Sequence, residues 1–367
     1  MNVAAAIRAT AAGMLLLAGA DAAAGSACHD ATPWPQADRL FRGDSAWRGA
    51  DGAFSVDLGD ERVLWLFGDT WIDPSARGTR DGATMIRNSV AIQQGLDPST
   101  AGIDFYWRHG ADGAPLEFLA TGGDEWIWPG HGVRVGERLV LFFNRVRGAG
   151  EGLGFESAGW GAMMVENPDE APDEWRIRAL DTPIDRDGVI VGFASVLRHD
   201  DFVYAFGTPD AVKSHPVFAA RWTPEQLARG DLLAPAWWGG DDVGWFTDLD
   251  AHARVPLFDH GQSELTIHYD AAAARFLAVQ SVGFGPADIA LREAAEIIGP
   301  WSPPRIVFRP PEHAKRDIMI YAAKAQPALQ GDGLVVTYVT NSFRFENHLN
   351  DPDLYYPRFV RLRPCPD

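Results

Sequence analysis

The sequence predicts an all-β fold, a five-bladed β-propeller built from four-stranded antiparallel blades. Extended, β-rich segments recur from one end of the chain to the other, and no long stretch keeps helical periodicity. A hairpin, in which a small and often glycine-containing strand leads through a polar turn into an aromatic-aliphatic strand, occurs five times at a spacing of about 70 residues. Such a spacing is typical of a radial repeat. A two-domain β-sandwich is the alternative, but the chain has no linker near its middle.

The second strand of each hairpin gives the clearest copy of the repeat. These strands start 58 to 76 residues apart, at 64–67, 140–143, 203–206, 277–280 and 335–338. Material for two further strands follows each copy, with examples at 88–93, 161–165, 217–221 and 359–362. Short helical patches fit at 224–229 and 292–297. Four strands in each of five units therefore account for the chain.

The first strand of each hairpin is expected to line the central channel, as the innermost strand of a propeller blade does. These strands are predicted at 52–58, 130–135, 192–197, 261–269 and 321–329. The start of a first strand and the end of a second strand lie at the same face of the disc. We therefore expect a ligand to bind at that face.

Residues 1–27 have the pattern of a secretory signal peptide. Arg8 precedes an apolar run at 9–20, and small residues follow at 22–27. The apolar run is too short to span a membrane. We therefore expect a secreted or periplasmic protein in which residues 28–367 form one propeller domain. A lipid anchor on Cys28 is the alternative, although Gly25 stands where a lipoprotein signal usually has leucine.

The net charge limits the kinds of binding partner to expect, and the cysteine count bears on the cellular compartment. The formal charge is −18 with no block of lysine or arginine, so nucleic acid and anionic membranes are poor partners. We expect no membrane insertion and a monomer. Cys28 and Cys365 are the two cysteines, at opposite ends of the mature chain, and in an oxidising compartment we expect them to form a disulfide. Two unpaired thiols are the alternative.

Asp51 and Asp69 are the main catalytic candidates. They bracket an apolar segment whose middle, 59–62, is a polar turn signal. A hairpin centred near Asp60 places the two aspartates opposite each other, with Cβ atoms about 4.5–5.5 Å apart, although a single bulge would move them. Paired carboxylates repel, so one pKa rises and that group can act as an acid while its neighbour stays ionised. The alternative is that each aspartate simply ends a strand.

Such a pair is what a glycoside hydrolase requires. A separation of about 5–5.5 Å suits a retaining mechanism, and one of about 6.5–9.5 Å implies inversion. Glu264 is the reserve general acid, because alternation along its predicted channel strand places it on the same face as Thr266 and His268. A charge facing a channel is costly unless it is paired or functional. A structural ion pair with Lys324 or Arg145 is therefore the alternative for Glu264.

Other polar or aromatic side chains fall at matching positions of the predicted rim, where they could bind the hydroxyl groups or the apolar face of a sugar. These predicted substrate-binding residues are Asn88, Trp128, His131, Asn144, Arg145, Lys324 and Asn341. Each could instead satisfy a turn or a contact between blades. Trp126, Trp237, Trp238 and Trp245 are similarly either sugar-stacking platforms or packing residues.

The chain shows no signature of a cofactor. No histidine, cysteine or carboxylate cluster has zinc spacing, so we expect no catalytic metal. A structural calcium ion at Asp248 and Asp250 is a weaker expectation. The sequence also lacks a Gly-x-Ser-x-Gly elbow, a phosphate loop and a dinucleotide fingerprint.

Several motifs resemble those of a secreted bacterial propeller family long catalogued as a domain of unknown function. The resemblance covers roughly residues 40–362 and rests on the segments 51–56, 64–70, 86–92, 128–130, 263–269 and 299–301. Some members of that family are endo-acting D-arabinanases that cut the arabinan of mycobacterial cell walls. Its catalytic carboxylates lie at the start of the first hairpin and at the end of its second strand, which implies Asp51 and Asp69 here. The fold is similar to that of arabinanases, fructosidases and levansucrases.

The sequence thus predicts a secreted glycoside hydrolase that acts on a furanose-rich polysaccharide, with an arabinan as the first candidate. Asp51 is the expected nucleophile because it opens the innermost strand, and Asp69 is then the general acid. A non-catalytic carbohydrate-binding propeller would keep the aromatic and amide rim but would tolerate loss of either carboxylate. A structural scaffold would have no affinity for sugars.

Overall fold

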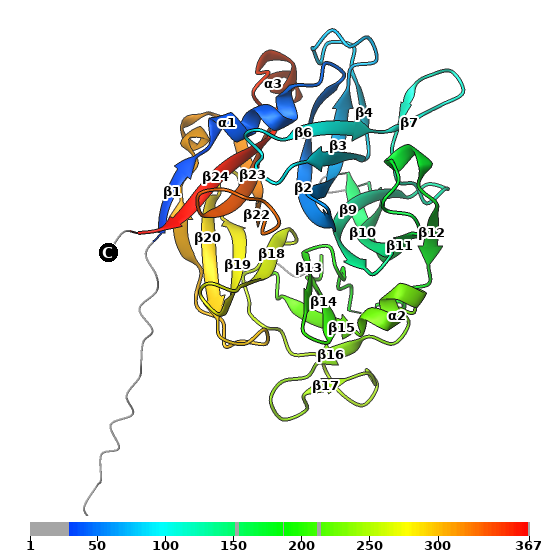
Figure 1. The fold of residues 1–367 in the computed structure, drawn as a ribbon, viewed down its shortest axis with the longest axis vertical. Helices are drawn as coiled ribbons and strands as arrows, with labels where there is room; N and C mark the ends of the chain where they lie inside the picture. Colours follow the sequence, from blue (N-terminus) through cyan, green and yellow to red (C-terminus); the bar gives the residue numbers. More distant parts are fainter. Residues whose placement is uncertain (1–28, 151–153, 186, 211–213, 366–367) are drawn as a thin grey trace, which may run out of the picture.

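A computed structural model of the chain describes residues 29–150, 154–185, 187–210 and 214–365. It confirms the prediction of an all-β, five-bladed propeller, in which five antiparallel sheets surround a central axis (Figure 1). The predicted signal peptide, residues 1–27, lies outside the described residues and stays a prediction. Among the helices of the described part, none is long and apolar enough to cross a membrane.

Each blade is a sheet whose strands follow the chain outward from the axis. The innermost strands are β2 (Trp47–Gly59), β9 (Trp126–Val135), β13 (Ser195–His199), β18 (Leu265–Asp270) and β22 (Ile318–Ala325). The second strands are β3 (Arg62–Ile72), β10 (Arg138–Gly148), β14 (Phe202–Gly207), β19 (Arg275–Val282) and β23 (Leu334–Ser342). The third strands are β5 (Ser89–Gln94), β11 (Phe155–Val165), β15 (Phe218–Trp222), β20 (Asp288–Ala294) and β24 (Pro357–Pro364).

The outer edges of the blades vary more than the inner strands. The fourth strands of blades 1 to 4 are β6 (Gly102–Tyr106), β12 (Ile177–Leu180), β16 (Ala236–Trp238) and β21 (Arg305–Phe308). Blade 3 adds β17 (Trp245–Phe246), blade 1 adds β4 (Thr84–Ile86), and β7 (Arg108–His109) pairs with β8 (Pro115–Leu116) outside the blades. These additions lie in long connections, where loop length is tolerated best.

Blade 5 takes its outermost strand from the other end of the chain. Strand β1 (His29–Pro33) pairs antiparallel with β24, and His29 lies opposite Pro364 (Figure 1). The ring is therefore closed by backbone hydrogen bonds between the first and last described strands. Cys28 lies outside the described residues, so the disulfide with Cys365 stays a prediction.

The helices are short and lie in connections. They are α1 (Pro35–Asp38), α2 (Pro224–Arg229), α3 (Phe345–Asn350) and the 3-10 turns η1 (Arg39–Arg42), η2 (Pro172–Glu174) and η3 (Pro311–Ala314). The helix predicted at 224–229 is confirmed as α2, which has a capping box at Thr223 and ends at Gly230. The helical patch predicted at 292–297 is wrong, because residues 288–294 form β20. Most of this strand is buried, and Arg292 is buried because it bonds Gln280, so its polar residues do not mark an exposed helical face.

The core is divided into clusters that fill the spaces between blades. One cluster joins blades 1 and 5 and is centred on Phe41 in η1, which is fully buried. The Phe41 ring lies 5.0 Å from Trp65, 5.5 Å from Phe67 and 5.3 Å from Phe359, measured between centroids. The segment between β1 and β2 thus places an aromatic side chain between blades 1 and 5, where the ring closes.

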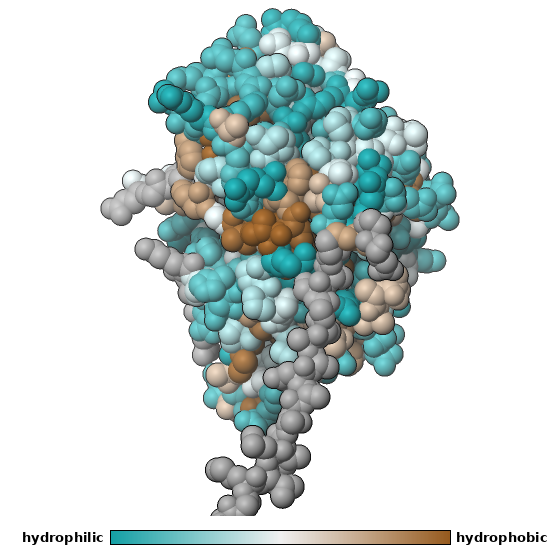
Figure 2. All heavy atoms as spheres, turned by 90° about the vertical axis from the view of Figure 1, so that its left-hand side faces the viewer, coloured by the Kyte–Doolittle hydropathy of each residue, from teal (hydrophilic) through white to brown (hydrophobic). Residues whose placement is uncertain are grey.

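The outer wall of blades 4 and 5, on the left of Figure 1, is mostly hydrophilic, with a group of hydrophobic side chains near its middle (Figure 2). This surface agrees with a chain that carries 50 aspartates and glutamates against 32 lysines and arginines. Like charges spread over the outside favour solubility.

Replacing Phe41 with alanine is expected to destabilise the ring by about 3–5 kcal/mol, because the substitution leaves a cavity among three aromatic rings. Equilibrium denaturation measures this loss. Leu233→Ala is the control, since Leu233 is 58% exposed and its truncation should change the free energy of unfolding by less than about 0.5 kcal/mol. Equal, small effects of both substitutions would contradict a structural role for the Phe41 cluster.

Candidate active site

The β2–β3 hairpin brings Asp51 and Asp69 to the same end of the channel. Ala50 pairs with Thr70 and Phe54 with Leu66, which keeps the register predicted around Asp60. The register is irregular on both sides of Asp51, so this residue lies in a bulge. The bulge turns the backbone at Asp51 without taking the carboxylate away from Asp69, whose charge contributes to the pKa of Asp51.

A glycine opposite Asp51 makes room for its carboxylate. A Cβ atom on Gly68 would overlap with Oδ1 of Asp51, so any larger residue at 68 would displace one of them. Gly68 directly precedes Asp69 in β3. The two acids therefore share one tightly packed corner of the hairpin.

Tyrosines from blade 5 complete the surroundings of Asp51. The hydroxyl of Tyr321, near the middle of β22, donates to Oδ2 of Asp51 at 2.8 Å, and the Tyr355 hydroxyl is a second hydrogen-bond partner. Asn341 donates through Nδ2 to the Tyr321 oxygen at 3.0 Å and so orients this hydroxyl. The predicted residue Asn341 is thus brought to the site, where it reaches Asp51 through Tyr321.

The sequence analysis missed both tyrosines. Tyr321 opens the predicted fifth channel strand, a position that could have indicated it. Tyr355 lies in the connection between β23 and β24 with a φ of 62°, an unusual backbone conformation for a bulky residue. The sequence carries no signal for that geometry.

Asp69 is held by groups from blades 1 and 2. Trp128 in β9 donates its indole N–H to Oδ1 at 3.0 Å, and the Arg87 guanidinium lies 3.6 Å from Oδ2. Arg87 in turn stacks over the Trp126 ring, with its Cζ atom 4.3 Å from the ring centroid. Trp128, predicted as a sugar-binding residue, therefore contacts a candidate catalytic acid directly. Arg87 is a further residue that the sequence analysis missed.

The two carboxyl groups differ in how burial is offset. Burial, together with the charges of Asp69 and Glu264, raises the pKa of Asp51 to about 8, although the hydrogen bonds from the two tyrosines oppose that rise. Burial also raises the pKa of Asp69, but the Trp128 N–H and the Arg87 cation oppose that rise. A proton held by the pair is therefore favoured on Asp51, whereas the partners of Asp69 favour its ionised form.

Glu264 forms a buried ion pair with Lys324. Lys324 in β22 is fully buried and donates to the Glu264 carboxylate and to the Gly52 carbonyl oxygen, the latter at 2.5 Å. Burial lowers the pKa of Lys324, whereas the negative charges of Glu264 and Asp51 raise it. The ion pair with Lys324, the structural alternative for Glu264, is present, and the catalytic role of Glu264 stays a prediction. Lys324 is too deeply buried for the predicted contact with substrate.

Two other predicted sugar-binding residues occupy structural positions. Asn88 is fully buried and bonds the backbone of Leu119 and Ile127 with both ends of its amide. His131 joins three blades, because Nε2 contacts the Ser55 carbonyl oxygen at 2.9 Å and Nδ1 accepts the Val196 N–H at 2.8 Å. Burial lowers the pKa of His131 to about 4, so its ring is neutral. Neither side chain has a polar atom left for a ligand.

Asn144 and Arg145 lie farther out on blade 2. Asn144 is opposite Trp128 in the sheet and accepts a hydrogen bond of 2.6 Å from the Ser157 hydroxyl. Arg145 donates to the Ala158 carbonyl oxygen at 2.8 Å and lies 3.8 Å from the Glu125 carboxylate. Both side chains support the edge of the site rather than the carboxylate pair.

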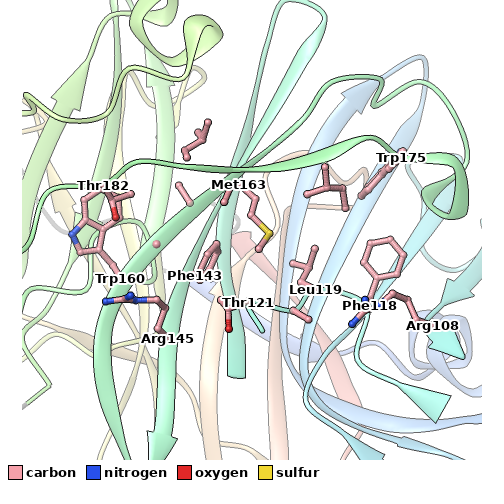
Figure 3. A pocket seen from close by; sticks show the side chains of 16 residues that line it. Arg108, Phe118, Leu119, Thr121, Phe143, Arg145, Trp160, Met163, Trp175 and Thr182 are labelled. Atoms are coloured by element: carbon pink, nitrogen blue, oxygen red, sulfur yellow. The ribbon is translucent and has the colours of Figure 1, made fainter. Parts of the chain in front are cut away.

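Beside Arg145 a pocket of about 560 Å³ opens over the outer part of blade 2 (Figure 3). Phe143, Trp160, Met163 and Trp175 contribute much of its apolar wall. Neither Asp51 nor Asp69 lines it, so the carboxylate pair lies outside this hollow.

The tryptophans that were candidates for sugar stacking fall into two groups, one buried in blade 3 and one beside Asp69. Trp237 and Trp238 are buried in β16 and pack within the core or against Trp245, in agreement with the packing interpretation. Trp126 and Trp128 lie beside Asp69.

The described residues contain no group of three or more histidine, cysteine, aspartate or glutamate side chains arranged to hold a metal ion. At the weak calcium candidate, the Asp248 carboxylate accepts the backbone N–H groups of Asp250 and Ala251, which form a turn. Calcium binding there stays untested.

A family model described as a domain of unknown function, DUF5005, matches residues 36–364. The chain belongs to this family. The match includes all five blades and both candidate acids. No curated protein matches the sequence.

A solved structure shares the fold at low sequence identity, and two further structures resemble the chain less closely. A protein of Bacteroides ovatus ATCC 8483, described as a putative hydrolase, has a TM-score of 0.69 and 18% identity over 91% of this chain and 90% of that chain. The catalytic domain of a GH62 α-L-arabinofuranosidase of Coprinopsis cinerea has a TM-score of 0.48 and 11% identity, over 92% and 96% of the two chains. An α-L-arabinofuranosidase of Lactobacillus brevis has a TM-score of 0.48 and 14% identity, over 89% and 93%.

His131→Ala is expected to lower the free energy of unfolding by about 3 kcal/mol at pH 7, because the Val196 N–H and the Ser55 carbonyl oxygen lose their partner. His109→Ala, on the exposed β7, is the control. The folded-state pKa of His131 lies below its unfolded value, so the wild type should lose stability as pH falls from about 6.5 toward 4. Denaturation curves at several pH values would contradict this role if the variant kept the same pH dependence.

Asp51→Asn is expected to stabilise the fold increasingly as pH rises. The folded-state pKa of Asp51 is raised, so the wild type loses stability between its ordinary value near 3.8 and about 8, and asparagine removes that loss. Melting temperatures of wild type and variant should therefore be similar near pH 4 and differ most near pH 8. Asp57→Asn, an exposed position on the same hairpin, should show no such trend. A difference independent of pH would rule out a raised pKa.

Proposed function

We propose that the protein is a secreted glycoside hydrolase that cleaves a furanose-rich polysaccharide, with an arabinan as its substrate. The observation that carries the proposal is a pair of neighbouring carboxyl groups in unlike surroundings, Asp51 bonded by a tyrosine hydroxyl and Asp69 beside an indole N–H and a guanidinium group. Glycoside hydrolysis requires this combination, because one group protonates the leaving oxygen while the other acts at the anomeric carbon or on water.

The electrostatics support Asp51 as the general acid. Its raised pKa keeps a proton available near neutral pH, and Tyr321 fixes the orientation of the carboxyl group. Asp69, beside the Arg87 cation and the Trp128 N–H, supplies the negative charge. This assignment is the reverse of the one made from strand position alone.

In the proposed reaction Asp51 transfers its proton to the glycosidic oxygen as the bond to the anomeric carbon breaks. Asp69 either attacks that carbon to form a glycosyl ester, which water then hydrolyses, or takes a proton from the water that attacks directly. In both routes one water molecule is consumed and Asp51 regains a proton. Charge develops on the sugar ring beside Asp69, where a negative carboxylate stabilises it.

The choice of an arabinan rests on the sequence. The motifs around Asp51 and Asp69 resemble those of the propeller family that includes endo-D-arabinanases, and both acids stand at the matching positions of the first hairpin. Export of the protein is inferred from residues 1–27. Secretion would place the enzyme where polysaccharides are found.

Purified protein should release reducing ends from one member of a panel of D-arabinan, L-arabinan, levan and inulin. We expect Asp51→Asn and Asp69→Asn each to lower kcat by about 100-fold to 10,000-fold. Asp57→Asn, with its carboxylate at the opposite end of the hairpin, is the matched control and should retain activity. The rate should also fall as pH rises through about 8, where Asp51 loses its proton.

Circular dichroism of every variant separates loss of chemistry from loss of fold. Cleavage that persists in folded Asp51→Asn or Asp69→Asn would show that other residues carry the reaction. A folded wild type that binds a polysaccharide without cleaving it would instead establish the carbohydrate-binding propeller. If the folded wild type neither binds nor cleaves any polysaccharide of the panel, the glycosidase proposal fails.

A further inference from the structure

Two phenylalanines stand in solvent near the mouth of the channel. Phe284, in the connection between β19 and β20, is 87% exposed, and Phe343, just after β23, is 56% exposed. Their ring centroids are 6.0 Å apart and their planes are inclined by 48°. Blades 4 and 5 thus each contribute one aromatic ring to a small apolar surface.

The topology places this pair at the same end of the propeller as the carboxylates. Asn341, two residues before Phe343, holds the Tyr321 hydroxyl that donates to Asp51. Ile320, next to Tyr321, donates its backbone N–H to the carbonyl oxygen of Gly285 at 2.8 Å, and Gly285 follows Phe284. Each phenylalanine is therefore tied through its neighbour to the strand that supplies the partner of Asp51.

Neither ring has a clear role in stabilising the fold. An exposed aromatic side chain gains little of the transfer free energy that burial gives, and Phe284 is nearly as exposed as in an unfolded chain. Phe343 is followed by Arg344, whose guanidinium forms an ion pair of 2.9 Å with Asp317. Exposed aromatic groups gathered on one surface can mark a binding site.

We propose that Phe284 and Phe343 form a stacking site for a sugar residue of the polysaccharide chain, next to the residue held at Asp51. This inference rests on the proposed function and extends it to a binding subsite. The inclined rings offer their faces to the C–H groups of a furanose ring, while its hydroxyl groups stay in solvent. Two rings are far too small for a stable protein interface, which buries about 800 Å² on each partner.

If the subsite exists, binding of the polysaccharide depends on these two rings even when the catalytic step is blocked. Binding is measured by affinity electrophoresis in gels that contain the polysaccharide cleaved by the wild type. The full-length Asp69→Asn variant is used as the background, because its turnover is expected to be slow enough to leave the polysaccharide intact. Phe284→Ala and Phe343→Ala should each weaken the apparent affinity by about tenfold, as expected for loss of about 1.4 kcal/mol of apolar contact. Phe284→Tyr should restore retardation, because it returns an aromatic face.

Leu233→Ala is the matched control, an exposed apolar side chain in the connection between α2 and β16, at the opposite end of the disc. It should leave retardation unchanged. Retardation that both alanine variants keep, in protein that cleaves the same glycan when Asp69 is intact, would overturn the stacking site and leave the proposed function standing. If wild type cleaves none of the panel and Asp69→Asn is retarded by none, both proposals fall together.

Discussion

The ammonium group of Lys324 is the interaction on which the site depends. It lies fully buried in β22 and contacts the Glu264 carboxylate of blade 4 and the Gly52 carbonyl oxygen of blade 1. A buried cation is tolerated only when it is paired, so these partners are fixed relative to each other. Because Gly52 follows Asp51, the same contact holds the bulge that aims the candidate acid. Through Lys324, Glu264 thereby supports the bulge at Asp51.

The surroundings of Asp51 and Asp69 offset the cost of burying a negative charge to different extents. The two aspartates therefore differ in how readily they ionise. Asp69 has a cation and an indole N–H beside it, whereas Asp51 has neutral hydroxyl partners and the field of two other carboxylates. The difference comes from which blade faces each group, since Arg87 and Trp128 belong to the side of blades 1 and 2 and Tyr321 to blade 5. Chemistry that needs one proton on the pair follows from this asymmetry.

The sequence was sufficient to predict the propeller and the positions of the two acids, because both follow from local sequence patterns. The mirrored hairpin around Asp60 gives the register, and the repeated aromatic strands give the blades. It was insufficient where a side chain's partner is distant. Asn88 and His131 look like rim ligands until the backbone groups that they bond are known, and Tyr321 meets Asp51 across 270 residues of chain. The pattern for β20 was ambiguous because its polar residues are buried by pairing.

Closure of the ring by β1 and β24 has a consequence for the order in which the protein becomes active. Blade 5 supplies Tyr321, Tyr355, Asn341 and Lys324, yet its sheet is complete only when the first described strand joins the last. A nascent chain that has made four blades holds both aspartates but none of these partners. Without blade 5, Asp51 would lack its tyrosine partners and the burial that blade 5 provides. The site would therefore become competent for catalysis in one late step, the pairing of β1 with β24. Activity would then indicate that the whole chain has folded.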